Sequence, residues 1–233
     1  MGSRINRKLA QRVKELLGDQ SELSVLEVGC GSISHLAIEK AVRITGMDIS
    51  PRQLQRNSYV SHKILGDIQD YPLDSETYDI AVCWDVLEHL HYPSKALINI
   101  CHSLKPNGLV VLAAPNCISI KGLTTKLTPH RAHVLFYRRI VGDTRAGKDD
   151  QGPFPTYLKP GMWPSGIRRF AEKNGLNIEY FSLYEGPVPS YFREKNKGAD
   201  ILFGLIGFIS RMLTLNKVDL THSDYIIVLR KPE

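Results

Sequence analysis

The sequence contains few cysteines, and no two of them are close together. The four are far apart with no C-x-x-C spacing, at Cys30, Cys83, Cys101 and Cys117. This spacing argues against a disulfide framework or a cysteine zinc site. Three of them fall in apolar surroundings, which predicts buried, reduced thiols in a reducing compartment. A cytoplasmic protein is therefore expected.

Long apolar runs are also absent. The first 17 residues contain no apolar core of a secretion signal, and no run reaches the roughly 20 residues that span a bilayer. With 42% hydrophobic and 23% charged residues, the chain of 233 residues is neither disordered nor fibrous and suits one α/β domain. Its net charge of +6 favours anionic partners without identifying one.

The segment VLEVGCGS, residues 25–32, has the pattern of a buried strand that ends at a tight turn. Gly29 and Gly31 lack the Cβ atoms that would keep a ligand away from the backbone. A glycine-rich strand end is common to many α/β folds, so the acidic residues downstream are needed to make the signal specific.

A second apolar segment, residues 41–48, ends in Asp48, and Ser50-Pro51 after it has the pattern of a helix N-cap with proline at the first helical position. Asp48 follows Gly31 at about the spacing expected between a nucleotide-binding glycine turn and a ribose-binding carboxylate. The alternative for Asp48 is a helix-capping role.

Strands are expected over 24–28, 41–48, 59–65, 80–84, 109–114, 176–183 and 223–229. Helices are expected over 4–17, 34–40, 93–104 and 165–175, with a turn over 105–108. This alternation predicts a parallel sheet with ligands at the carboxyl ends of its strands.

Four segments in this order resemble the class I S-adenosylmethionine-dependent methyltransferases, in particular the small-molecule, methyltransferase type 11-like group. They are VLEVGCG, GMDIS, GDIQDYPLDSETYDIAVCWDVLEHL and LKPNGLVVLAAPN, within residues 20–116. The resemblance resumes more weakly at 170–176 and in the last strand. One departure is Ile33, which stands where this family commonly has a third glycine.

The resemblance implies a three-layer α/β/α sandwich with a Rossmann-like, mostly parallel seven-stranded sheet and an antiparallel last strand. It also implies S-adenosyl-L-methionine as cofactor and S-adenosyl-L-homocysteine as product. Glu27 would hold the amino group, Asp48 the ribose hydroxyls and Asp67 the adenine amine. The other cofactor-binding residues that it implies are Gly29, Cys30, Gly31, Ile49, Ile68 and Trp84. Asp67 has an alternative role as a turn-forming residue after Gly66.

The segment after the fourth strand bears on the reaction. Trp84-Asp-Val-Leu87 stands where enzymes that methylate amino groups of nucleic-acid bases have an Asn/Asp-Pro-Pro-aromatic motif, so O-methylation is favoured. His89 is the nearest candidate for a catalytic base, and a structural histidine is the alternative. Asp85-x-x-Glu88-His89 also resembles a metal-binding pattern, but no second histidine follows and no metal is expected. A nicotinamide enzyme would prefer glycine where Ser34 stands.

Residues 117–163 are expected to form an insertion that binds the methyl acceptor. Basic and aromatic residues alternate here, and the expected acceptor-binding residues are His130, Arg131, Tyr137 and Arg138, with His133 as a second candidate base. This mixture suits a phosphorylated or sugar-containing small molecule, either nucleotide-linked or lipid-linked, rather than a nucleic acid. The alternative is a solvated lid.

A second insertion, residues 190–216, is expected to be helical and apolar. The uncharged part of 201–215 is too short to span a membrane. Peripheral contact with a membrane surface is one interpretation, and a core-packed or dimer-forming helix is the other, so monomer and homodimer both stay open.

The sequence therefore predicts one methyltransferase domain over residues 1–233, in the cytoplasm or at the periphery of a membrane. Two alternatives remain. One is a catalytically inactive cofactor-binding or partner subunit. The other is an RNA or quinone-precursor O-methyltransferase that uses a divalent metal.

Overall fold

The computed structural model describes residues 2–18, 20, 22–35 and 41–233. Contacts between Cα atoms divide the chain into two compact units. Unit 1 consists mainly of residues 115–156 and 182–225, and unit 2 mainly of residues 3–114, 157–181 and 226–233.

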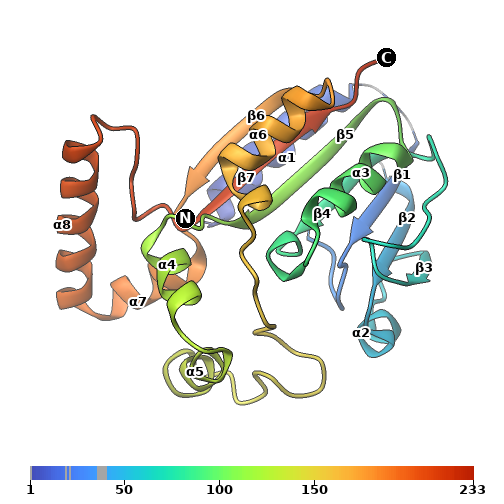
Figure 1. Cartoon of the computed structure of the whole chain (residues 1–233). Helices are drawn as coiled ribbons and strands as arrows, with labels where there is room; N and C mark the ends of the chain where they lie inside the picture. Colours follow the sequence, from blue (N-terminus) through green and yellow to red (C-terminus); the bar gives the residue numbers. More distant parts are fainter. Residues whose placement is uncertain (1, 19, 21, 36–40) are drawn as a thin grey trace. The chain divides into compact units, whose positions relative to one another are not determined.

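A seven-stranded sheet has the order β3-β2-β1-β4-β5-β7-β6 (Figure 1). Its strands are β1 (Leu23–Val28), β2 (Ala41–Asp48), β3 (His62–Leu65), β4 (Tyr78–Trp84), β5 (Leu104–Pro115), β6 (Asn177–Tyr184) and β7 (Asp224–Arg230). The pairs β1–β2, β1–β4, β2–β3 and β4–β5 are parallel, and β7 lies antiparallel between β5 and β6. The Rossmann-like sheet predicted from the sequence is confirmed.

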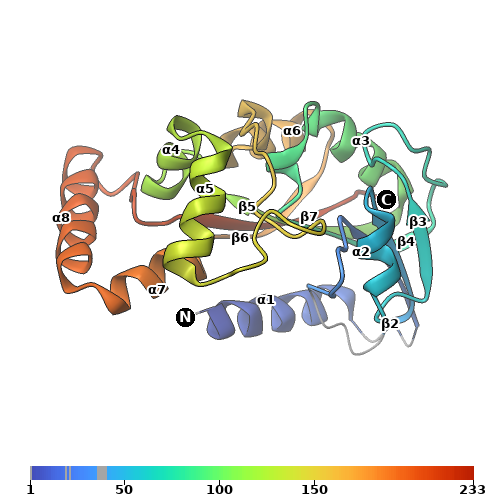
Figure 2. The ribbon, with the colours of Figure 1, turned by 90° about the horizontal axis from the view of Figure 1, so that it is seen from below.

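Helices flank the sheet of unit 2 on both faces. They are α1 (Gly2–Leu17), α2 (Pro51–Arg56), α3 (Pro93–Ser103) and α6 (Pro164–Lys173), with the 3-10 turns η1 (Leu87–His89) and η3 (Pro160–Met162). Figure 2 shows α3 and α6 on one side of the strands and α1 and α2 on the other. Because both faces are covered, central residues such as Ile80, Leu109 and Leu112 are fully buried.

The cap predicted before α2 is present. Ser50 has extended backbone angles, and its hydroxyl accepts a hydrogen bond from the Gln53 N–H at 3.1 Å. Pro51 occupies the first helical position, where its missing N–H costs nothing. This local chemistry starts the helix immediately after the end of β2.

Unit 1 contains α4 (Ile120–Leu127), α5 (His130–Phe136), the π-helical turn η2 (Tyr137–Val141), α7 (Pro187–Lys195) and α8 (Lys197–Leu213). They lie in the two segments expected as insertions, except that α7 begins at Pro187, before the expected start at 190. The start of α4 contacts the segment before β7 and the first residue of β7. The Ile120 N–H donates to the Leu220 carbonyl at 2.9 Å, and Lys121 pairs with Asp224 at 2.6 Å.

Two local expectations need correction, and one lies outside the described residues. The turn expected over 105–108 is an irregularity within β5, where the register shifts and Asn107 has φ +63°. An ion pair between Lys105 and Asp79, at 2.9 Å, fixes this irregular part of β5 to the neighbouring strand β4. The strand therefore begins before the irregularity. The third strand covers only His62–Leu65. Most of the helix expected over 34–40 lies outside the described residues.

Candidate functional site

The glycine turn after β1 lies at the carboxyl end of the parallel strands in unit 2. Gly29 and Gly31 have φ values of +63° and +53°, a region that L side chains rarely adopt. A Cβ on Gly29 would lie 2.3 Å from the Val86 Cγ2, whereas a Cβ on Gly31 would meet no atom of the described residues within 4 Å. Gly29 is therefore required by protein packing, while none of the described residues blocks a ligand that approaches Gly31.

Asp48 ends β2 beside this turn. Its Oδ2 accepts a hydrogen bond from the Gly31 N–H at 2.9 Å, and its Oδ1 accepts one from the Ser50 N–H at 2.8 Å. These two bonds fix the carboxylate against the glycine turn. A carboxylate offers about four acceptor positions, so each oxygen keeps capacity for a ligand hydroxyl. The helix N-cap is Ser50, and Asp48 supports it by accepting from the Ser50 N–H while it keeps capacity for the hydroxyls of the ribose-binding prediction.

Glu27 lies inside the same strand end and is only 2% exposed. Its Oε1 accepts a hydrogen bond from the Ser34 hydroxyl, while its Oε2 is buried and makes no hydrogen bond within the described part of the chain. Burial raises the pKa of the Glu27 carboxyl, and bonds from Ser34 and the His35 N–H oppose that rise. A buried acceptor oxygen of this kind is costly unless a donor arrives to satisfy it.

Apolar and acidic residues follow the ends of β2 and its neighbour β3. Ile49, directly after Asp48, is 73% exposed, and the Gly66 N–H donates to the Asp48 carbonyl at 3.1 Å. Asp67 follows, and its Oδ1 accepts from the Gln69 N–H at 2.9 Å, so the turn-forming role considered for it is present. Ile68 is 4% exposed.

Two more of the predicted cofactor-binding residues are Trp84, which stacks on a histidine, and Cys30, which is buried in the core. The Trp84 ring stacks on His35 with a centroid distance of 6.1 Å and an interplanar angle of 5°. Burial lowers the pKa of His35, so the ring that Trp84 covers is neutral at pH 7.

Cys30 is fully buried. Burial, with smaller effects of Asp48 and Glu27, raises the pKa of its thiol to about 12, which makes it a packing group rather than a nucleophile.

His89 lies in η1, just beyond the end of β4. Its Nε2 is 3.9 Å from Oε1 of Glu88, a residue that is 4% exposed. Asp85 is exposed and has φ +52°. Across the described residues, no group of three histidine, cysteine or acidic side chains is arranged to hold a metal ion.

The last part of the insertion expected over 117–163 contacts this edge of unit 2, through Tyr157, a residue that was not among the predicted site residues. The Tyr157 N–H donates to the Glu88 carbonyl at 2.7 Å, and the Tyr157 ring lies 3.9 Å from the His91 ring between centroids. Tyr157 is 44% exposed. The aromatic residue was visible in the sequence, but nothing in the pattern linked it to a residue about 70 positions earlier.

The roles of two asparagines, Asn57, which is buried, and Asn99, which is half-buried, were also missed. The Asn57 side chain is 1% exposed and donates to the Gly31 carbonyl at 3.1 Å, so it supports the glycine turn from behind. Asn99 donates to the Ile68 carbonyl at 2.8 Å. Asparagine at these positions gave no motif from which either contact could be inferred.

The residues expected to bind the acceptor lie in unit 1, on α5 and η2. The His133 Nε2 and the Thr128 Oγ1 are 2.5 Å apart, and the His130 ring is 6.4 Å from the His133 ring between centroids. Burial and the charge of His130 lower the pKa of His133. The Arg138 Nε donates to the buried Ala146 carbonyl at 2.9 Å. Arg131 is exposed, and Tyr137 is half-buried.

Comparison with known proteins agrees with this fold and strand-end geometry. Residues 1–182 match the family described as "Methyltransferase domain". The mitochondrial ubiquinone biosynthesis O-methyltransferase of Candida albicans is 31% identical over 139 residues, which is 53% of this chain and 41% of that protein. The ubiquinone biosynthesis O-methyltransferase of Rickettsia typhi is 24% identical over 46% of this chain and 47% of its own length. The matches therefore span less than half of these curated relatives.

Among solved structures, an S-adenosylmethionine-dependent methyltransferase from Mesorhizobium loti aligns with a TM-score of 0.56. It is 12% identical and the alignment covers 93% of this chain and 94% of that one, a likeness that concerns the fold alone. Because the family match covers most of the chain, the protein belongs to the methyltransferase domain family, with the class I fold.

This family implies S-adenosylmethionine as cofactor, and the described residues fit it. The buried Oε2 of Glu27 suits an ammonium group, Asp48 suits a pair of hydroxyls, and the exposed Ile49 suits a purine face. Within the part of the chain that the structure describes, no atom blocks the approach of a ligand to the Gly31 backbone.

Proposed function

We propose that the protein transfers a methyl group from S-adenosylmethionine to an oxygen of a small-molecule or lipid-linked acceptor. The observation that carries this proposal is the strand-end cluster of Glu27, the glycine turn and Asp48. In this cluster the buried Oε2 of Glu27 makes no hydrogen bond within the described residues and could accept one from a cationic ligand. When bound, the cofactor supplies an electrophilic methyl group on a sulfonium sulfur.

The chain's own residues would bind and orient the reactants. Methyl transfer is an in-line displacement whose rate depends strongly on alignment. An oxygen nucleophile also has to lose a proton, for which His89 is the candidate within unit 2. We further propose that Tyr157 and His91, which pack ring to ring beside the Glu88 backbone, form part of the acceptor's surroundings.

O-methylation is supported by the sequence after β4 and by the names of the curated relatives, both of which are ubiquinone biosynthesis O-methyltransferases. The chemical class of the acceptor rests on the basic segment 117–140, which contains no acidic residue. Guanidinium groups capture phosphate or carboxylate in pairs of hydrogen bonds, so a phosphorylated or sugar-containing acceptor fits this segment.

Binding and turnover test the proposal separately. Calorimetry should detect S-adenosylmethionine binding, and incubation of the protein and labelled cofactor with metabolite extracts should yield a labelled product. Binding without any product across extracts would favour the inactive cofactor-binding subunit. A strict requirement for a divalent ion would favour the metal-dependent alternative.

Substitutions in the insertion test the acceptor site. Arg131→Lys should raise the acceptor KM or lower kcat while cofactor affinity stays within about twofold, because lysine cannot reproduce a bidentate contact. Arg169→Lys, at an exposed position on α6, is the matched control and should change neither value. Normal kinetics for Arg131→Lys would indicate that the insertion is a solvated lid and does not bind the acceptor.

His133 is tested by its pH profile. Burial and the charge of His130 lower its pKa, so its neutral form, which can accept a proton, persists to lower pH than for an ordinary histidine. His133→Ala should lower kcat and flatten the acidic limb of the profile if this residue is the base. An unchanged acidic limb would leave His89 as the candidate.

A further inference from the structure

The helix α8 of unit 1 exposes its large apolar side chains. Seven of them are between 45% and 81% exposed: Ile201, Leu202, Leu205, Phe208, Ile209, Met212 and Leu213. Successive helical residues are turned by about 100°, so the seven occupy one continuous arc of roughly 140°. No charged residue falls within that arc. We call this surface the apolar face of α8.

Small residues on the opposite side of α8 pack against unit 1. The Ser210 hydroxyl accepts a hydrogen bond from the Leu220 N–H at 3.3 Å, and a Cβ on Gly207 would lie 2.9 Å from the Thr221 Cγ2. Gly207 and Ser210 are buried. The helix is therefore docked by its small residues, and this contact turns the apolar face outward.

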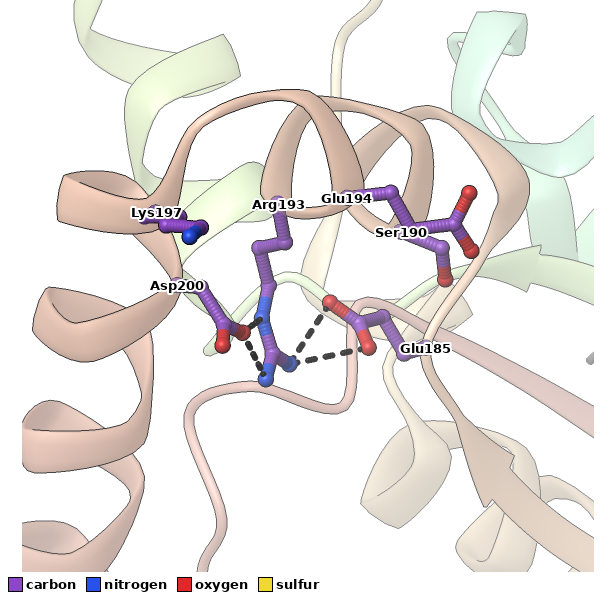
Figure 3. A pocket seen from close by; sticks show the side chains of 6 residues that line it. All are labelled: Glu185, Ser190, Arg193, Glu194, Lys197 and Asp200. Atoms are coloured by element: carbon purple, nitrogen blue, oxygen red, sulfur yellow. Dashed lines mark hydrogen bonds and ion pairs between the residues drawn. The ribbon is translucent and has the colours of Figure 1, made fainter.

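Ion pairs hold both ends of α8 in this orientation. Figure 3 shows the Arg193 guanidinium between two carboxylates, with Glu185 at 3.0 Å and Asp200 at 2.7 Å. At the other end, Arg211 pairs with Asp219 at 2.5 Å. The cavity of about 340 Å³ beside Arg193 is lined by this ion-pair group together with Ser190, Glu194 and Lys197, all on or next to α7 and α8, so we assign it to the junction of these two helices.

The charge left at the two ends of the apolar face is positive. Lys195 precedes α8, Lys197 is its first residue and Lys217 follows it. All three lysines are exposed. Against them stands one exposed carboxylate outside the pairs described above, Glu194. An outward apolar surface bordered by lysines is complementary to a lipid interface that carries negative headgroups.

From these observations we propose that the apolar face of α8 docks on the surface of an anionic lipid bilayer. The described part of the chain has no helix long and apolar enough to cross a membrane, so the contact would lie in the plane of the interface. A second copy of the chain is less well matched. Because lysines stand at both ends of α8, pairing two such helices in either direction brings lysine to lysine.

Vesicle sedimentation of the full chain tests this proposal. The protein should pellet with vesicles of phosphatidylglycerol and phosphatidylcholine in a 1:2 ratio, and much less with pure phosphatidylcholine. The double variant Leu205→Glu/Phe208→Glu should reduce the partition coefficient at least about tenfold. Ile98→Glu places the same charge on an exposed apolar position of α3 in unit 2 and should bind vesicles like the unmodified protein.

The lysines are tested independently. Lys195→Gln and Lys197→Gln should each weaken binding to the anionic vesicles about fivefold, and added salt should weaken it further. Circular dichroism and thermal melting verify that each variant is folded. Cofactor affinity in solution should not change, so failure of this proposal leaves methyl transfer untouched.

Three outcomes would overturn the proposal. One is equal pelleting with neutral and anionic vesicles. Another is unchanged pelleting of the Leu205→Glu/Phe208→Glu variant. The third is a concentration-dependent dimer, seen by analytical ultracentrifugation and abolished by that variant, in a protein that does not bind vesicles. That result would assign the apolar face of α8 to a second copy of the chain.

Discussion

Replacing Glu27 by glutamine separates cofactor binding from folding. Glu27 is 2% exposed, and its Oε2 makes no hydrogen bond among the described residues. Glutamine has nearly the same volume and keeps an oxygen that can accept from Ser34, but it removes the charge. A hydrogen bond to a charged group contributes about 1.5–3 kcal/mol. Affinity for S-adenosylmethionine should therefore fall about 10- to 150-fold.

Folding stability should not fall with affinity. Burial raises the pKa of Glu27, which means that the folded protein disfavours its charge. The pKa of the unfolded carboxyl is near its ordinary value of 4.5, and the folded one ionises at higher pH. The folded state binds more protons in this window, so the contribution of Glu27 to stability declines as pH rises through its folded-state pKa. Glu27→Gln should remove that decline and leave stability at pH 7 equal or higher.

Cofactor affinity should follow the opposite trend in the same window. An ammonium group prefers the ionised carboxylate, so binding by the unmodified protein should tighten as pH rises above 4.5 through the folded-state pKa of Glu27. Isothermal calorimetry across pH measures this slope, which should be absent in Glu27→Gln. Glu172→Gln, at an exposed position on α6, is the control. Unchanged affinity in Glu27→Gln, or a parallel loss of stability, would refute the reasoning.

Three further predictions concern the same site. Asp48→Ala should lower cofactor affinity at least about tenfold by calorimetry while the protein stays folded, because the ribose hydroxyls would lose charged acceptors; full affinity would remove Asp48 from the site. Gly29→Ala should lower the free energy of unfolding in denaturant by about 1–3 kcal/mol, since its Cβ would meet Val86 at a positive φ. Gly31→Ala should lower the stability less and the affinity for S-adenosylmethionine more. Equal effects of the two substitutions would contradict the geometry. A chelator should leave turnover unchanged, and recovery of lost activity by an added divalent ion would show instead that a metal is needed.

The local geometry of the candidate cofactor site could be predicted in large part from the sequence because its signals are local. An apolar run that stops at two glycines has one common structural solution, and parallel strands bring their carboxyl ends to one edge of a sheet. Gly29 and Asp48 therefore come together without any knowledge of packing. The N-cap at Ser50 is equally local, because its hydroxyl needs only the N–H three residues ahead.

Contacts between distant segments could not be predicted in this way. The hydrogen bond from Tyr157 to Glu88 and the support of the Gly31 carbonyl by Asn57 join residues that no motif connects. The bend within β5 shows the same limit. Lys-Pro-Asn-Gly reads locally as a turn, but the Lys105–Asp79 ion pair and the pairing of Leu104 with Tyr78 begin the strand before it.

The helix α8 shows most clearly which information each level holds. Its sequence alone determined a helix with large apolar residues over most of its circumference, because helical spacing and composition are local properties. Those residues could equally have faced a core. Only the tertiary structure decided the orientation, since Gly207 and Ser210 allow a close approach to residues 220 and 221 that bulkier side chains would block. Close packing of the small residues leaves the large ones outside.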